Sequence, residues 1–276
     1  MKILIVGASG LLAKPVINQM NKNGFGLRLF SRSVNESMFY TEYDIHQGDV
    51  FNVTDLEKAI TGCDAIHISI ASVNEANAVN AILEIAKRQE IKLVSYVSGC
   101  TVSEKNRWFP MIDNKFMAEQ KIINSGVPYI IFRPTWFFES LQLMVRDDKA
   151  VVFGKQDNPF RWVAAYDFAR MVSKAYLEPG ARNKIFYVFG PEPRLMKDLL
   201  TEYCKKYHPG IKHVNTVSTR FMKLVATLTK NKGLKNAVEL FSYFEKVKEP
   251  VTDQGETDSL IGKPELTFSK WLEIKD

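Results

Sequence analysis

The first fourteen residues constrain the fold of this chain most strongly. Residues Ile3 to Val6 are an apolar run, typical of a strand that is buried on both faces. Gly7-Ala-Ser-Gly10 follows, and residues 15 to 20 carry apolar side chains at helical spacing. A strand, a glycine turn and a helix in this order predict a phosphate-binding loop. Gly7 tolerates unusual backbone angles, Gly10 lets an anion approach the main chain, and the helix directs free N–H groups at that anion.

An ordinary strand-to-helix turn is the alternative, because two glycines three positions apart also occur by chance. Ala13 stands where such loops often carry a third glycine, which serves helix–strand packing, and the methyl group is a mild departure. The position of the loop between a β-branched run and a helix favours the phosphate-binding interpretation.

Strand and helix signals alternate through the first half of the chain. The strands predicted there are 3–6, 27–30, 64–71, 93–98 and 129–132, and the helices are 55–60, 76–88 and 115–124. The second half adds a strand at 184–189 and helices at 167–177 and 194–207, with Asp167 as the N-cap of its helix. Alternation of this kind requires right-handed crossovers and a parallel sheet with helices on both faces. We therefore expect an α/β, Rossmann-type doubly wound sheet, with ligands beyond the carboxyl ends of its strands.

The second half of the chain is less regular. Residues 221–228 and 237–247 each place apolar side chains on one helical face, and these helices form either a lid over the sheet or a plain packing face. Residues 254–262 are expected to be a loop, and residues 268–272 a closing helix. No segment resembles a linker, so we expect one domain over residues 1–276. Its smaller, mostly helical substrate region is contributed mainly by about 135–182 and 208–276.

The formal net charge of +6 and the pI near 9.0 raise the question of a nucleic-acid partner. The densest basic region, residues 220–248, spreads its charges between apolar helix positions and includes Glu239 and Glu245. This pattern favours a solvated helix face over nucleic-acid binding. A mildly basic protein also suits an anionic cofactor or substrate.

Cysteine and histidine usage indicates a reducing environment and no metal site. Cys63, Cys100 and Cys204 are odd in number and far apart, which favours free thiols, and the four histidines lack metal-ligand spacing. We expect a cytoplasmic protein without a signal peptide or a membrane partner, because Met1 leads into a core strand and no apolar run reaches membrane length.

Several motifs occur in the order found in a known family. They are the Gly7–Ala13 loop, Arg32 after the second strand, Asp49-Val50, Ser98, Lys115, Arg133-Pro134 and the segment 162–169. Over about residues 1 to 190 the chain resembles the atypical short-chain dehydrogenase/reductases, and within them the NmrA-like, NAD(P)-binding branch. The ordered set is more specific than any one of its members.

The resemblance implies a nicotinamide dinucleotide cofactor and a set of residues that hold it. This set is Gly7, Ser9, Gly10, Leu11, Leu12, Arg32, Ser33, Asp49, Val50, Ala71, Ser72, Lys115, Pro134 and Trp136. In such proteins an acid after the second strand binds the ribose 2′-OH, whereas an arginine accommodates a 2′-phosphate. Arg32 lies there without an adjacent acid, so NADP(H) is favoured over NAD(H). A surface arginine at a strand end is the alternative.

The catalytic part of the resemblance is incomplete. Ser98 and Lys115 match the family's serine and lysine, but Met111 stands where the family has its proton-transferring tyrosine. A thioether cannot transfer a proton. An epimerase or dehydratase relies on that tyrosine, so two interpretations remain. One is an NADPH-dependent oxidoreductase that reduces a small quinone, enone or carbonyl compound, with the proton from Lys115 through water or from solvent. The other is a non-catalytic NADP(H)-sensing regulatory protein.

An apolar pocket for a flat small-molecule substrate is predicted from five residues, Trp108, Met111, Phe137, Phe138 and Trp162. Core packing is the alternative role for each of them. Cys100 lies two residues after Ser98, and we interpret it as a small buried hydrophobe rather than a reactive thiol. The sequence leaves the oligomeric state open between monomer and dimer.

Overall fold

A computed structural model describes residues 1–71 and 74–274 of the chain. The chain divides into two compact units. The sheet unit comprises Met1–Pro134, Ala165–Val188 and Thr252–Lys263, and the second unit comprises Thr135–Ala164, Phe189–Val251 and Pro264–Asp276. Residues 165–182, which the sequence analysis places in the substrate region, belong to the sheet unit. The extent of a substrate region stays a prediction.

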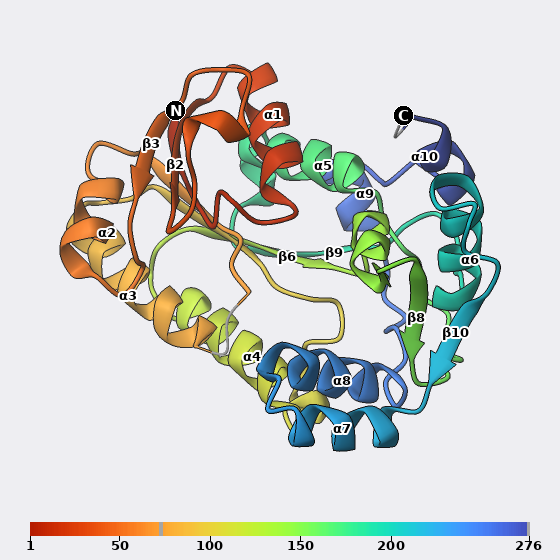
Figure 1. Cartoon of the computed structure of the whole chain (residues 1–276). Coiled ribbons are helices and arrows are strands. Elements are labelled where there is room, and N and C mark those ends of the chain that lie inside the picture. Colours follow the sequence, from red (N-terminus) through yellow and green to blue (C-terminus); the bar gives the residue numbers. More distant parts are fainter. Residues whose placement is uncertain (72–73, 275–276) are drawn as a thin grey trace. The chain divides into compact units, whose positions relative to one another are not determined.

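Seven parallel strands form the centre of the sheet unit, in the order β3-β2-β1-β4-β5-β6-β9 (Figure 1). Their bounds are β1 Lys2–Val6, β2 Gly26–Ser31, β3 Asp44–Gln47, β4 Ala65–Ile68, β5 Leu93–Val97, β6 Tyr129–Pro134 and β9 Lys184–Val188. The chain runs outward from β1 to β3 and then returns to β4 on its other side. This reversal leaves a crevice beyond the carboxyl ends of β1 and β4. The predicted doubly wound α/β fold is confirmed.

Helices cover both faces of this sheet. α1 (Ala13–Lys22) packs with α5 (Ala165–Leu177) on one face, and α3 (Glu75–Arg88) packs with α2 (Val53–Ile60) and α4 (Pro110–Ile123) on the other (Figure 1). Covering on both faces explains why the central strands read as continuous apolar runs: Ile3, Leu4 and Ile5 are fully buried. Short 3₁₀ turns η1 (Glu36–Met38), η2 (Glu104–Asn106) and η4 (Pro179–Ala181) connect these elements.

Two local predictions about this unit were wrong. Asp167 is not the N-cap of α5, because the helix begins two residues earlier; Asp167 lies buried in the first turn, and its Oδ1 lies 3.2 Å from the Arg170 guanidinium. The segment 254–262 is not a loop, since it contains the helix α9 (Gly255–Ile261). The side chain of Ile261 is fully buried, and α9 packs against α5 and β9.

The second unit is built around a small sheet in the order β10-β8-β7. Its elements are η3 (Phe138–Met144), β7 (Val145–Arg146), β8 (Lys149–Phe153), α6 (Met196–Tyr207), β10 (Val214–Val217), α7 (Thr219–Leu228), α8 (Lys232–Phe244) and α10 (Phe268–Ile274). Stacked aromatic rings fill its interior, among them Trp136 on Trp162 and Phe268 on Trp271. None of the helices in the described residues has both the length and the apolar character needed to cross a membrane.

Candidate functional site

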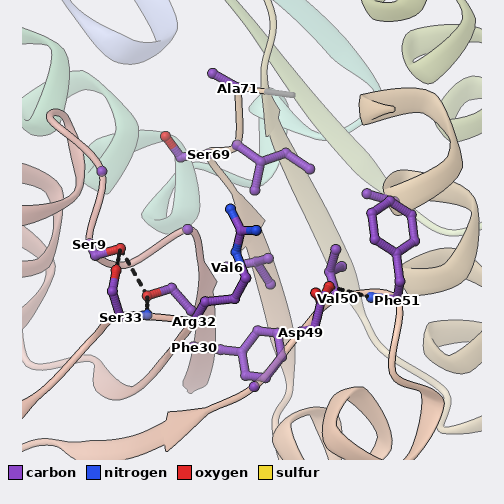
Figure 2. A pocket seen from close by; sticks show the side chains of 16 residues that line it. Val6, Ser9, Phe30, Arg32, Ser33, Asp49, Val50, Phe51, Ser69 and Ala71 are labelled. Atoms are coloured by element: carbon purple, nitrogen blue, oxygen red, sulfur yellow. Dashed lines mark hydrogen bonds between the residues drawn. The ribbon is translucent and has the colours of Figure 1, made fainter. Parts of the chain in front are cut away.

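A cavity of about 380 Å³ lies in the sheet unit beyond the carboxyl ends of β1, β2 and β4 (Figure 2). The residues that line it are Val6, Gly7, Ser9, Gly10, Phe30, Ser31, Arg32, Ser33, Gly48, Asp49, Val50, Phe51, Ser69, Ile70, Ala71 and Ala78. Its position at the reversal of strand order is where open parallel sheets bind ligands.

The loop after β1 is held in place by the neighbouring strands, and only glycine fits at its first position. Gly7 has φ +88°, and a Cβ there would lie 2.1 Å from the carbonyl oxygen of Ser69. The N–H groups of Gly7 and Ala8 both donate to the carbonyl oxygen of Phe30, at 2.9 and 3.2 Å. The main chain of the loop is thereby fixed between β2 and the residue after β4.

The N-terminus of α1 faces this loop without any neutralising group. Its N-cap position, Leu12, provides no side-chain cap, and the first turn contains no acidic residue. Within the described residues, the N–H groups of Leu11 and Leu12 donate to no acceptor. Free N–H groups and the positive end of the helix dipole together form an anion site.

Arg32 supplies a cation to the same cavity. Its side chain is exposed and extends across the middle of the cavity in Figure 2. Among the residues that the structure describes, Arg32 has no acidic partner, whereas Arg28 on the preceding strand β2 contacts Asp44 at 2.7 Å. The hydroxyls of Ser31 and Ser33 both lie 2.9 Å from Ser9 Oγ, which ties the segment after β2 to the glycine loop.

The wall of the cavity opposite Ser9 and Ser33 is formed by the segment that comes after β3 in sequence. Asp49 Oδ1 accepts a hydrogen bond from the Phe51 N–H at 3.0 Å, and Val50 packs against the sheet core. The Phe51 ring is 51% exposed although it lines the cavity. An exposed aromatic ring at a cavity wall offers a stacking surface for a flat heterocycle.

Eight of the residues predicted to bind the cofactor line this cavity: Gly7, Ser9, Gly10, Arg32, Ser33, Asp49, Val50 and Ala71. Leu11 and Leu12 adjoin it at the start of α1, and Ser72 lies outside the described residues. Eight further lining residues were not predicted from the sequence: Val6, Phe30, Ser31, Gly48, Phe51, Ser69, Ile70 and Ala78. The rule that ligands lie at carboxyl strand ends identifies Ser31 and Ser69, which end β2 and follow β4.

Lys115 lies on α4 in a buried polar cluster and does not line this cavity, although its partner Glu75 lies one helical turn before the lining residue Ala78 on α3. Its Nζ donates to Glu75 Oε1 at 2.8 Å and to the Val97 carbonyl at 3.3 Å, and Glu75 is 1% exposed. The Tyr96 hydroxyl donates to the same carboxylate oxygen at 2.6 Å. Burial, and then the nearby Glu75 carboxylate, raise the pKa of Tyr96 well above its usual value, so the phenol keeps its proton.

Ser98 is also bound to a buried carboxylate. Its hydroxyl donates to Glu119, which is fully buried and also accepts from the Arg133 Nε at 2.9 Å. Burial alone would lower the pKa of Arg133, but Glu119 and the Tyr187 hydroxyl raise it overall, so the guanidinium stays charged. Met111 is half-buried and lies one helical turn before Lys115 on α4.

The residues predicted to form a substrate pocket are divided between the two units. Trp108 and Met111 belong to the sheet unit, and Trp108 is 55% exposed. Phe137, Phe138 and Trp162 belong to the second unit and are buried there.

The Phe138 ring packs on Phe268 and Trp271, and Trp162 on Trp136. Pro134 ends β6 and accepts a hydrogen bond from the Cys100 N–H at 2.9 Å. The roles of all these residues, and that of Trp136 at the cofactor, stay predictions.

A comparison with protein families shows which family the chain belongs to. A family model described as NAD(P)H-binding matches residues 7–178, which include the glycine loop, Arg32 and Lys115. The chain belongs to this family. It is a member of the atypical short-chain dehydrogenase/reductases, of the NmrA-like kind, as the motifs indicated.

Individual relatives are distant. The photosystem II assembly factor Ycf39 of Trieres chinensis is 21% identical over 243 residues, which are 83% of this chain and 76% of that protein. The NADPH-dependent quinone oxidoreductase of Escherichia coli, solved with NADPH, has a TM-score of 0.75 and 20% identity, covering 98% of each chain. The triphenylmethane reductase of Citrobacter sp., solved with NADP(H), has a TM-score of 0.77 and 16% identity, covering 99% of each chain. These likenesses show a shared fold.

The residues of the cavity suit the phosphates of the dinucleotide that this family binds. A pyrophosphate needs close main-chain approach and free N–H groups, which the Gly7–Gly10 turn and the start of α1 provide. Among the described residues, no group of three or more histidine, cysteine or acidic side chains is arranged to hold a metal ion.

Proposed function

We propose that this protein is an NADPH-dependent oxidoreductase that reduces small quinones, enones or carbonyl compounds. One observation carries the cofactor part of the proposal: an exposed Arg32 without an acidic partner in the described residues extends into the cavity beside the glycine loop. A 2′-phosphate on the adenosine ribose would give this cation its counter-charge.

The hydroxyls that surround Arg32 support the same preference. Ser9 and Ser33 lie at the cavity wall, and the Ser33 hydroxyl donates to Ser9 Oγ at 2.9 Å, which leaves the Ser9 hydroxyl hydrogen free to turn towards a phosphate oxygen. A ribose 2′-OH would instead need an acidic acceptor next to β2, and Ser31, Arg32 and Ser33 provide none. We assign the Phe51 ring to the adenine, on which it can stack.

The nicotinamide ring supplies the hydride when the cofactor is bound, and the chain must orient the substrate and manage a proton. Lys115 is the candidate proton donor, because its ammonium group is held in place by Glu75 at 2.8 Å. Met111 has no proton to give. Quinones and enones suit such a site, since the charge that develops during their reduction is delocalised and needs little acid assistance.

A non-catalytic NADP(H)-sensing protein is the second candidate, and one observation favours it. Both side chains that match the family's catalytic set are bound to buried carboxylates, Lys115 to Glu75 and Ser98 to Glu119. Together with Met111, this arrangement suits a protein that retains the cofactor site without the chemistry. The similarity to an assembly factor is in line with this candidate.

NADPH oxidation against a panel of quinones, enones and aldehydes distinguishes the two candidates. We expect turnover with at least one quinone or enone, and a fall in kcat of about a hundredfold in Lys115→Ala, which is typical of a lost proton donor. Lys121→Ala is the matched control, because Lys121 lies on the same helix and its ammonium group donates to the neutral Asn80 side chain, at 3.1 Å, rather than to a buried carboxylate.

Thermal unfolding of both variants separates a chemical effect from a loss of fold. Cofactor binding without turnover on the whole panel would contradict the oxidoreductase and support the sensor. Turnover that Lys115→Ala leaves unchanged would show that the proton comes from solvent.

A further inference from the structure

The helix α7 carries an apolar stripe that the fold of the second unit does not use. Phe221, Leu224 and Leu228 are 59%, 57% and 74% exposed. Their spacing of three and four residues places them on one side of the helix, one turn above another. Three large apolar side chains in a row on one helix differ from the singly scattered ones of an ordinary surface.

The stripe points away from the face by which α7 packs. α7 lies alongside α8, and its buried residues are Thr219 and Ala226 (Figure 1). At about 100° per residue, Ala226 is roughly 200° from Leu224 around the helix axis. In α8, by contrast, Val238 and Phe241 are buried. Both helices were predicted to form either a lid or a packing face, but of the two only α8 buries large apolar side chains in this way.

The segment of sequence that carries this stripe contains charges of one sign only. Residues 219–238 contain five cations and no acidic residue, and all five cations are exposed: Arg220, Lys223, Lys230, Lys232 and Lys235. An acidic neighbour, Glu239, lies 3.9 Å from Lys235 and follows this segment. Glu245 accepts a hydrogen bond from the Thr219 hydroxyl at 2.9 Å at the start of α7. The apolar stripe therefore lies in a segment that is positively charged along its length and has acidic residues only beyond it in sequence.

We infer that this surface of α7 and the start of α8 docks on an anionic lipid bilayer. A bilayer interface offers both components that the surface needs, anionic headgroups for the cations and an acyl layer for Phe221, Leu224 and Leu228. A second copy of the chain at this helix would bring like charges together. An acidic protein would neutralise the cations but must also provide a groove for three protruding apolar side chains.

Sedimentation of the full chain with lipid vesicles tests this inference. We expect the apparent affinity for vesicles of phosphatidylcholine mixed with phosphatidylserine to be at least roughly tenfold higher than for vesicles of phosphatidylcholine alone. This affinity should decrease as the salt concentration is raised. The triple variant Phe221→Ser/Leu224→Ser/Leu228→Ser should lose this binding. Leu143→Ser is the matched control, because Leu143 is 73% exposed on η3 and should leave the binding unchanged.

The charge variant Lys223→Gln/Lys230→Gln separates the two components of the surface. It should weaken binding to the anionic vesicles and leave the thermal unfolding midpoint unchanged, since both side chains are exposed. Equal binding to both vesicle types, no binding, or binding that the triple variant retains would overturn the inference. A dimer that the triple variant abolishes would assign the surface to a second copy, and capture by polyglutamate without vesicle binding would assign it to an acidic protein.

Discussion

Gly7→Ala is expected to weaken NADPH binding by about a hundredfold or more, which is about 2.7 kcal/mol, and to destabilise the fold. The Cβ of the alanine would lie 2.1 Å from the Ser69 carbonyl oxygen, which belongs to the backbone and cannot rotate away. The φ of +88° adds strain of about 1–2 kcal/mol for any residue with a side chain. The loop must therefore shift, and the N–H groups at the start of α1 lose their alignment with the phosphates.

Gly24→Ala separates the two causes of this effect. Gly24 has nearly the same φ, +80°, but no atom lies within 4 Å of a Cβ built there. This variant should lose stability through backbone strain alone and keep its affinity for NADPH. Urea unfolding and a fluorescence titration with NADPH measure the two quantities. If Gly7→Ala binds NADPH as tightly as Gly24→Ala does, the glycine loop does not hold the cofactor.

Glu119→Leu is expected to lower the free energy of unfolding by about 3–5 kcal/mol. The Glu119 side chain is fully buried, and it is the ion-pair partner of Arg133, whose side chain is 14% exposed. Leucine would leave the guanidinium buried without a counter-charge, and the Ser98 hydroxyl without its acceptor. The loss of a partner costs far more than the net contribution of an intact pair.

The exposed pair between Arg88 and Glu57 is the control for this prediction. Its side chains are 61% and 42% exposed, so Glu57→Leu should change the free energy of unfolding by only about 0–1 kcal/mol. The midpoints of urea unfolding for both variants give the comparison. Similar shifts in the two variants would contradict a buried, stability-determining role for Glu119.

The sheet and the glycine loop could be predicted from sequence because both depend on local patterns. The strand at residues 3–6 is a continuous apolar run, and Gly7 follows it directly. The carboxylates of the buried clusters carry no such signal. Glu75 lies in the first turn of α3 and Glu119 within α4, where acidic residues are usually solvated. Their partners come from other elements, such as Lys115, forty residues from Glu75 in sequence.

The local errors have related causes. α9 has seven residues, too few for a helical period to be recognised, and it is stabilised by packing of residues such as Ile261. Asp167 has the side chain of a typical N-cap, but α5 begins at Ala165, and the residues of its first turn are held by tertiary packing. Phe51 resembles a loop residue in sequence. Only the fold places its ring at the cavity that also contains Arg32.

The central claim is that this chain binds NADP(H) in the cavity beside Arg32, and a paired titration tests it most directly. Calorimetric titration of the wild type with NADPH and with NADH should give at least about tenfold tighter binding of NADPH, because a charge-assisted contact contributes about 1.5–3 kcal/mol. Arg32→Ala should abolish this difference and leave NADH binding unchanged. Equal affinities in the wild type, or a preference that persists in Arg32→Ala, would contradict the account.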